Sequence, residues 1–347
     1  MTPRERWLAV LNHRKADRVP CDYRATEEAT ERLLDHLGLP DVPAMLERLH
    51  IDSIVGVGPR YVGPPIPAGE DVFGVQYVDS DYGLGTYRNA IYHPLAGYET
   101  VDEIEAHYRW PSPDWWDYSG IAQRVAGKDD AVIGGGGSEP FLTYKSLRGT
   151  ERGYLDLIEK PEIVHYCLGK LYELCYQNTL RMYEAIPGKV MWTSVAEDLG
   201  TQQSLLVSLE HIREFFLPHM KRMIALVHSA GAFVCHHSDG AVRENLPNMI
   251  AAGIDILDPV QWRAKGMDRE GLKRDFGDRL VFHGAMDNQQ TLAFGSVEDV
   301  RQEVADNIRI LGEGGGYILG PCHNIQAISP PENVVAMYDA AYELGAA

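Results

Sequence analysis

Eight short runs of apolar and β-branched residues recur along this chain, separated by stretches that show helical spacing. The runs are Val19–Arg24, Ile51–Gly58, Ala131–Gly137, Val190–Leu199, Ala232–Asp239, Ile254–Gln261, Leu280–Asp287 and Gly316–Asn324. Alternation of strands with helices implies parallel strands joined by crossovers. Eight such units close most naturally into a (β/α)8 TIM barrel, which commonly takes ~250 residues. We therefore predict an α/β fold built on one barrel.

Capping residues and the spacing of apolar residues identify several of the helical stretches. Thr2 followed by Pro3 is a typical N-cap with proline at the first helical position, so we expect the chain to open with a helix. Apolar residues at helical spacing also predict amphipathic helices over Leu209–Ser229 and Val297–Leu311.

The chain is longer than a barrel needs, and the surplus lies after the second run. We predict a single domain over residues 1–347 with an insertion at 72–120. The insertion is rich in aromatic residues. It is either a cover over a substrate pocket or, as we favour, a satellite core or a dimer contact.

Composition excludes several classes of protein. With 32 Lys+Arg against 50 Asp+Glu the net charge is −18, which disfavours binding to nucleic acid. No apolar stretch approaches the ~18 to 20 residues of a membrane span, and the N-terminus shows no secretory signal. The five cysteines form no CxxC pair. We therefore expect a cytoplasmic protein with reduced thiols.

Four consecutive glycines, 134–137, lie at the end of the third run. They lack the sequence context of a phosphate loop or a dinucleotide site. We favour a strand end at which the backbone approaches a neighbour or a ligand closely, and keep an anion site as the alternative.

The active site of a barrel lies at the C-terminal ends of its strands, so the last residues of each run are the candidates. His237 and Asp239 lie on one face at the end of the fifth run, Cys322 ends the eighth and Glu197 ends the fourth. One imidazole, one thiolate and two carboxylates form a sensible zinc set. The alternatives are a polar mouth with structural hydrogen bonds and a small buried Cys322, or a nucleophilic pair of Cys322 with His323.

Several motifs together resemble the uroporphyrinogen decarboxylase superfamily, and they cover nearly the whole chain. They are Arg4–Arg6, Asp17–Pro20, Leu147–Gly149, Asp198–Gln202, His237–Gly240, Phe282–Asp287, Gly316–Asn324 and Ser329–Asn333. The resemblance implies a distorted (β/α)8 barrel, in agreement with the eight runs.

The superfamily has two broad activities. Its decarboxylases carry an arginine-rich N-terminal segment, Arg-Gln-Ala-Gly-Arg, that grips the porphyrinogen's carboxylates. The corresponding stretch here is Val19–Glu28, which retains Arg24 alone and is acidic beyond it. A substrate with eight carboxylates would meet repulsion at this surface, so porphyrinogen decarboxylation is the less favoured alternative.

The other branch contains corrinoid-dependent methyltransferases, which bind zinc through His-x-Cys on the fifth strand and a cysteine near the C-terminus. His237 and Cys322 match two of these positions, and Asp239 replaces the first cysteine. This change either abolishes the metal or makes the ligand set harder, with Glu197 completing it. A harder set favours an oxygen partner such as a methyl ether.

From this resemblance we expect a zinc-dependent methyltransferase, an O-demethylase component. It would pass a methyl group from an O-methylated small molecule, such as an aryl methyl ether, to the cobalt(I) of a cobalamin-type corrinoid on a partner protein. His237, Asp239 and Cys322 are the expected catalytic residues. Gln261 and Asp287 are candidates for orienting the substrate, although rim hydrogen bonds are the favoured interpretation of both. A scaffold role and a homodimer stay open.

Overall fold

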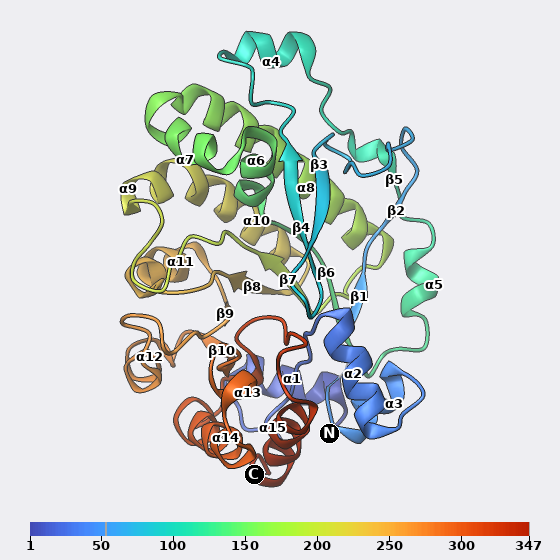
Figure 1. Ribbon diagram of the computed structural model, residues 1–347, viewed down its shortest axis with the longest axis vertical. Coiled ribbons are helices and arrows are strands. Elements are labelled where there is room, and N and C mark those ends of the chain that lie inside the picture. Colours follow the sequence, from blue (N-terminus) through green and yellow to red (C-terminus); the bar gives the residue numbers. More distant parts are fainter. Residues whose placement is uncertain (53, 347) are drawn as a thin grey trace.

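A parallel sheet of seven strands runs through the centre of the molecule in the order of the chain (Figure 1). The computed structural model describes residues 1–52 and 54–346. The strands are β1 (Ile54–Val57), β6 (Val132–Ser138), β7 (Trp192–Val195), β8 (Phe233–His237), β9 (Ile256–Asp258), β10 (Val281–Met286) and β11 (Tyr317–Pro321). Each predicted run from the second to the eighth coincides with one of these strands, although β6 extends one residue beyond the third run. The sheet curls as in a distorted barrel.

The first predicted run, Val19–Arg24, is not a regular strand, so the prediction of eight regular strands is corrected at this point. It nevertheless lies between β11 and β1, where an eighth strand would close the barrel. Asp22 N donates to Leu319 O at 2.8 Å, and Leu319 N donates to Pro20 O at 2.9 Å. On its other side Cys21 O accepts from Asp52 N, just before β1, at 3.0 Å. An extended segment therefore fills the gap between β11 and β1 without forming a continuous ladder.

Helices cover the outside of the sheet and close one of its ends (Figure 1). They are α1 (Pro3–Leu11), α2 (Glu27–Leu37), α3 (Val42–Arg48), α4 (Val101–His107), α5 (Ile121–Val125), α6 (Pro140–Arg148), α7 (Thr150–Glu159), α8 (Pro161–Ala185), α9 (Leu209–His211), α10 (Leu217–Ser229), α11 (Leu246–Ala252), α12 (Arg269–Phe276), α13 (Thr291–Phe294), α14 (Val297–Leu311) and α15 (Pro331–Leu344), with short turns η1 (Pro113–Trp115), η2 (Ile212–Phe216) and η3 (Arg243–Asn245). The predictions for the N-terminal helix, for 209–229 and for 297–311 are confirmed. The second of these is one helix with a π turn, η2, between α9 and α10.

Helix α1 closes the N-terminal end of the barrel. Thr2 caps it in a capping box with Glu5, and Trp7 is fully buried against the strands. The interior at this end is a separate apolar cluster to which β6, β8, β9, β10 and β11 each contribute a residue. Burial of such side chains is the main stabilising contribution here.

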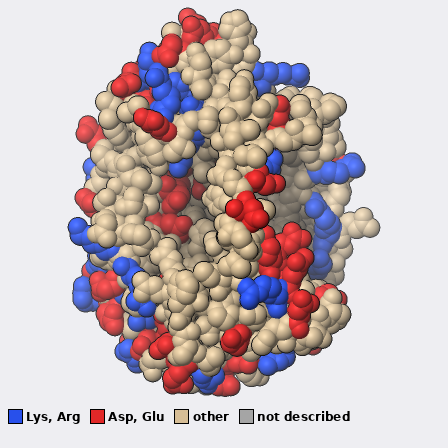
Figure 2. Space-filling model, viewed as in Figure 1, with Lys and Arg blue, Asp and Glu red and all other residues tan. Residues whose placement is uncertain are grey.

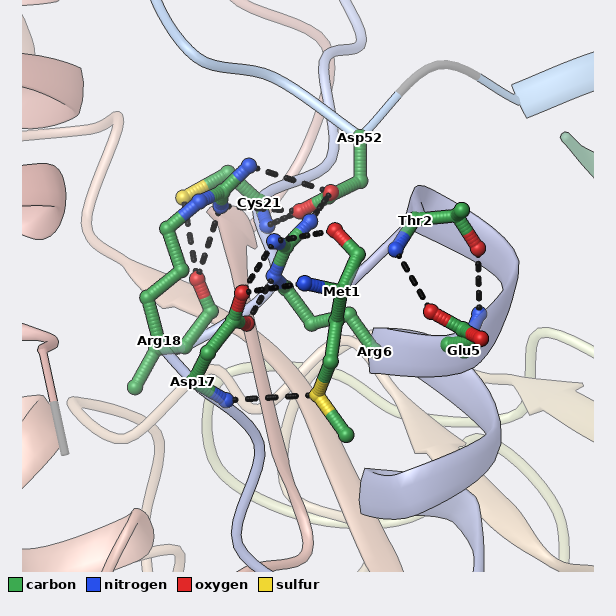
Figure 3. A network of polar contacts seen from close by, with 9 residues as sticks. Met1, Thr2, Glu5, Arg6, Asp17, Arg18, Cys21 and Asp52 are labelled. Carbon is green, nitrogen blue, oxygen red and sulfur yellow. Dashed lines mark hydrogen bonds and ion pairs between the residues drawn. The ribbon is translucent and has the colours of Figure 1, made fainter. Parts of the chain in front are cut away.

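A buried polar network joins α1 to the irregular first segment (Figure 3). The Asp52 carboxylate accepts from Arg6 at 2.5 Å, from Arg18 at 2.9 Å and from the backbone N–H of Cys21 at 3.0 Å. Arg6 also pairs with Asp17 at 2.7 Å. Because Asp52 directly precedes β1, the network fixes the first segment against the sheet by side-chain contacts.

The residues between β1 and β6 form a lobe outside the seven-stranded sheet. It contains a short pair, β2 (Arg60–Tyr61) with β5 (Trp116–Asp117), and an antiparallel hairpin, β3 (Gln76–Asp81) with β4 (Thr86–Tyr92). Tyr98, Tyr108 and Trp110 of this lobe pack against the main core, as a satellite core would. The boundaries 72–120 stay a prediction.

The four glycines of β6 allow β7 to approach closely. A Cβ on Gly134 would clash with the indole of Trp192, and a Cβ on Gly137 would clash with the carbonyl oxygen of Ser194. The ladder between β6 and β7 is irregular between these two glycines. The close-approach interpretation of the glycine run is confirmed.

No helix within the described residues is both long enough and apolar enough to cross a lipid bilayer.

Candidate active site

A cavity of about 360 Å³ opens at the C-terminal ends of the strands, where the barrel fold places catalytic sites. Its lining comes from the first segment, β6 to β9 and the loop after β11. The residues are Arg24, Glu139, Trp192, Ser194, Ala196, Cys235, His237, Asp258, His323 and Asn324. The space-filling view shows a hollow in this face with acidic side chains inside it (Figure 2).

Asp258 is the centre of the charged groups in this cavity. Its carboxylate accepts two bonds from the Arg24 guanidinium, at 2.9 and 2.6 Å, and one from His237 Nδ1 at 2.9 Å. His283 Nδ1 lies 2.6 Å from its other oxygen. Asp258 is buried, whereas Arg24 and His237 reach the cavity. One buried carboxylate therefore orients two side chains at the mouth.

His283 lies beneath this layer and is fully buried. Its Nε2 is 3.1 Å from Asp22 Oδ2, and its ring is adjacent to the indoles of Trp7 and Trp192, which also contact each other. Each buried charge thus has an opposite charge beside it, which such groups require.

The charges shift the proton affinities of these groups. Burial alone would raise the pKa of Asp258, but Arg24, His283 and the hydrogen bond from His237 hold it well below its ordinary value. Burial alone would lower the pKa of His237, but the hydrogen bond and charge of Asp258 raise it to about 9. His237 therefore carries a positive charge at neutral pH in this arrangement.

Asp239 lies at the rim and is held by Gln261. Gln261 Nε2 donates to Asp239 Oδ1 at 2.9 Å, and Gln261 Oε1 accepts from Gly240 N at 3.0 Å. Asp239 N donates to Asp198 at 2.8 Å. Burial raises the pKa of the Asp239 carboxyl. Gln261, a candidate for substrate orientation, makes rim hydrogen bonds of the kind that the favoured interpretation expects.

Cys322 is outside the main cavity. Its thiol donates to Val260 O at 3.1 Å, and burial raises its pKa well above the ordinary value. It lines a very small separate cavity with Gln261 and Asp287, among other residues. Asp287, the second candidate for substrate orientation, is buried. Its carboxylate pairs with Arg263 and accepts a hydrogen bond from the backbone N–H of Gln289 at 2.9 Å.

Glu197 faces away from the mouth cavity. Tyr172 Oη donates to it at 2.5 Å, and the backbone N–H of Phe141, in α6, donates at 3.1 Å. It is fully buried, and burial raises its pKa to about 8. The carboxylate therefore joins β7 to α6 and α8.

These positions test whether the predicted ligands fit a zinc ion. Among residues 1–52 and 54–346, no three His, Cys, Asp or Glu side chains are gathered as metal ligands. His237, Asp239 and Cys322 belong to one end of the barrel, but each is engaged with another group of the protein. The arrangement does not fit zinc as it stands, and the zinc site stays a prediction.

The sequence interpretation missed several residues of this cavity. Asp258 follows the apolar run 254–257 directly, so the rule of inspecting strand ends could have identified it. Glu139 and Ser194 line both this cavity and a neighbouring one of about 370 Å³. The neighbouring cavity also contains Phe73 and Leu171. A ligand with a polar and an apolar part would find both environments here.

Comparisons with known proteins agree with the fold. The chain is 25% identical over 323 residues to a uroporphyrinogen decarboxylase of Erwinia tasmaniensis, covering 89% of this chain and 77% of that one. A second relative with that name, from Nitrosococcus oceani, is 25% identical over 230 residues, and the match spans only 54% of its length. A solved methyltransferase from Methanosarcina mazei has the same fold, with a TM-score of 0.68, 21% identity and 99% of each chain covered.

The profile of the family described as uroporphyrinogen decarboxylase matches residues 118–344, which include β6 to β11 and most of the mouth. This chain belongs to the uroporphyrinogen decarboxylase family.

Proposed function

We propose that this protein is a methyltransferase that moves a methyl group from an O-methylated small molecule, such as an aryl methyl ether, to the corrinoid of a partner protein. The family membership supports an enzyme, and the fold is that of the Methanosarcina mazei methyltransferase over the full chain. The choice between the family's activities rests on the mouth of the barrel.

The single observation that carries the proposal is that Arg24 is already bound to Asp258. Within the described part of the chain it is the one arginine that lines the mouth cavity, and its guanidinium is bound by two hydrogen bonds to Asp258. A substrate with many carboxylates would have to compete with a buried aspartate for it. Glu139 lines the same cavity, and its carboxyl lies near those of Asp198 and Asp239, so further carboxylates are unfavourable there. A neutral or weakly charged substrate fits this site better.

The two neighbouring cavities suit a small ligand. Their volumes of about 360 and 370 Å³ are near the lower end of the roughly 300–1,000 Å³ typical of ligand sites. Phe73, Leu142 and Leu171 offer apolar contacts for a ring, and Glu139 and Ser194 lie between that region and His237.

The chain's own residues would act on the oxygen that loses the methyl group. A cobalt(I) corrinoid supplies the nucleophile that accepts the methyl group. The C–O bond breaks, and its electron pair stays on the oxygen. His237 would contact that oxygen through Nε2, because Asp258 holds Nδ1 and no hydrogen bond engages Nε2 within residues 1–52 and 54–346. A positioned donor of this kind stabilises charge that develops in the transition state.

Methoxy-aromatic compounds with free cob(I)alamin as acceptor test the proposal. We expect a demethylated product with the native protein and at least about a hundredfold slower turnover with His237→Ala, as for loss of one preorganised donor. If native protein demethylates none of the methoxy-aromatic compounds tested, the proposal is wrong.

The names of the curated relatives favour a second candidate, a decarboxylase. It needs neither a corrinoid nor a methyl donor. Release of carbon dioxide from uroporphyrinogen by the purified protein would establish it. We expect none, because Arg24 is engaged.

A further inference from the structure

We infer that a cavity at the N-terminal ends of the strands, which we term the basal cavity, binds a small organic phosphate. It has a volume of about 630 Å³ and is lined by the loop after α1, by helix α12 and by the turn Gly312–Gly315 that precedes β11. It is larger than either cavity at the mouth and falls within the roughly 300–1,000 Å³ typical of ligand sites. The inference does not depend on the proposed function.

The charged residues of the basal cavity reverse the balance of the whole chain, which has 50 acidic against 32 basic residues. Two carboxylates line the cavity, those of Glu270 and Glu313. The basic residues of its lining are Arg14, Lys15, Arg18, Lys273, Arg274 and Arg309. A concave surface with an excess of one sign of charge concentrates ligands of the opposite sign.

Three of these cations already have a carboxylate partner. The pairs are Arg18 with Asp52 at 2.9 Å, Arg274 with Asp275 at 2.8 Å and Arg309 with Asp306 at 2.8 Å. Figure 3 shows the first of them, in which Arg18 belongs to the network that fixes the first segment. These three residues contribute to the lining, but they are not the groups that we assign to the ligand.

Lys273 provides a fixed positive charge in the wall of the cavity. Its ammonium group donates to Leu311 O at 2.8 Å and to Gly315 O at 2.9 Å, both just before β11. These partners are neutral, so the charge of the side chain is not cancelled by them. Burial and the charge of Lys273 together lower the pKa of His13, as expected in a region of positive potential.

Arg14 and Lys15 are exposed at the rim, and within residues 1–52 and 54–346 neither side chain makes a hydrogen bond or an ion pair. The backbone that carries them is nevertheless fixed. Arg14 N donates to Ala9 O at 2.8 Å, and a Cβ on Gly315 would lie 2.9 Å from the carbonyl carbon of Arg14. The absence of a side chain at Gly315 therefore lets the turn pack against this loop. A guanidinium and an ammonium group held side by side suit the oxygens of a phosphate.

The deeper part of the lining is apolar, and its buried members are Val10, Ala16, Ile310 and Tyr317. Tyr317 Oη donates to Gly284 O at 2.9 Å, so its hydroxyl group is already engaged. Cations at the rim above an apolar floor favour a ligand that has phosphate groups and an apolar body, such as a nucleotide, over a free inorganic anion.

Calorimetric titration at low ionic strength tests the inference with three probes: ATP without divalent cations, inorganic triphosphate and adenosine. The double variant Arg14→Gln/Lys15→Gln removes the two unpaired cations at exposed positions and should preserve the fold. The matched control is Arg32→Gln/Lys128→Gln, which removes the same charge from exposed residues outside the cavity.

We expect ATP to bind native protein, with a Kd that rises about tenfold or more in the double variant because two charge-assisted contacts are lost. The control should stay within about twofold of native protein, since its charges lie far from the ligand and are screened. Triphosphate should bind more weakly than ATP, and adenosine should bind the most weakly of the three.

Several outcomes would overturn the inference. Absence of ATP binding at about 1 mM is one. Equal affinity of the double variant and native protein would place the phosphate elsewhere, and an equal loss in the control would show that net charge alone attracts it. Adenosine binding as tightly as ATP would remove the role of the cations, and triphosphate binding as tightly as ATP would remove that of the apolar floor.

Discussion

His237 and Asp258 are register partners on the adjacent strands β8 and β9, and Nδ1 of the histidine lies 2.9 Å from Oδ2 of the aspartate. The contact fixes the imidazole ring at the point where both strands end. It also makes Asp258 common to Arg24, His237 and His283, so a change at this carboxylate affects the whole mouth.

Replacing Asp258 by Asn should destabilise the protein strongly. The amide keeps the shape but leaves the cations of Arg24 and His283 to share Asp22 as a buried counter-charge, which costs about 3–5 kcal/mol. Urea unfolding at pH 7 measures the loss. Asp278→Asn, at an exposed position, is the control and should change stability by less than about 0.5 kcal/mol. A loss below about 1 kcal/mol for Asp258→Asn would contradict the pairing described here.

The stability of the protein should fall as pH rises from about 6.5 to about 9 because of His237. Its pKa in the folded protein, about 9, is above its ordinary value of 6.5. The stabilisation from Asp258 is therefore complete below pH 6.5 and is lost as pH rises through 9. The His237→Gln variant lacks this contribution. Between pH 6.5 and pH 9 the free energy of unfolding of the variant should fall by about 1–2 kcal/mol less than that of native protein. This figure is smaller than the full pKa shift implies, because His237 is partly exposed to solvent. If the free energies of unfolding of the two proteins change with pH in parallel, His237 does not titrate in this way.

Glu197→Gln should remove a stability penalty that grows with pH. Burial raises the pKa of Glu197 to about 8 in the folded protein, from an ordinary 4.5. The folded state therefore binds more protons than the unfolded state between these values, and stability falls as pH rises. We expect the variant to gain on the order of a few kcal/mol over native protein between pH 5 and pH 8. The exposed Glu31, changed to Gln, serves as the control. A constant difference across pH would refute the burial effect.

The predicted zinc site has a specific consequence for Gln261. Binding requires Asp239 to leave Gln261, and it requires the Cys322 thiol to lose its proton and leave Val260 O. If the site exists, Gln261→Ala should raise zinc affinity because Asp239 is released, and Cys322→Ala should abolish binding. Affinity should also rise with pH. Competition with a chromophoric chelator measures all three effects, and equal affinity of the two variants would rule out this ligand set.

The repeating strands could be predicted because each is a short, strongly apolar run bounded by a helix. Val19–Arg24 is also a short run with apolar residues, yet Pro20 lacks an N–H for a ladder and Asp22 is used by buried contacts. Its place beside Leu319 depends on contacts some 300 residues away in sequence, which no local pattern contains.

The candidate site was predictable in location and only partly in composition. The rule of strand ends identified His237, which lines the cavity. It could not show that Glu197 turns toward Tyr172 and Phe141, because the direction of a buried side chain depends on the packing of α6 and α8. Asp258, the last residue of β9, was passed over in favour of Gln261, three residues later in the following loop.

The closure of the barrel between Val19–Arg24 and β11 bears on how the protein is made in the cell. The first segment leaves the ribosome about 300 residues before its backbone partner Leu319. Pairing across so long a span is slow, because the intervening loop must close first. Until β6 to β11 have been made, Trp7 and the apolar face of α1 lack the strands that bury them. The nascent chain is exposed to aggregation over that interval, and holding chaperones should engage helix α1 during it.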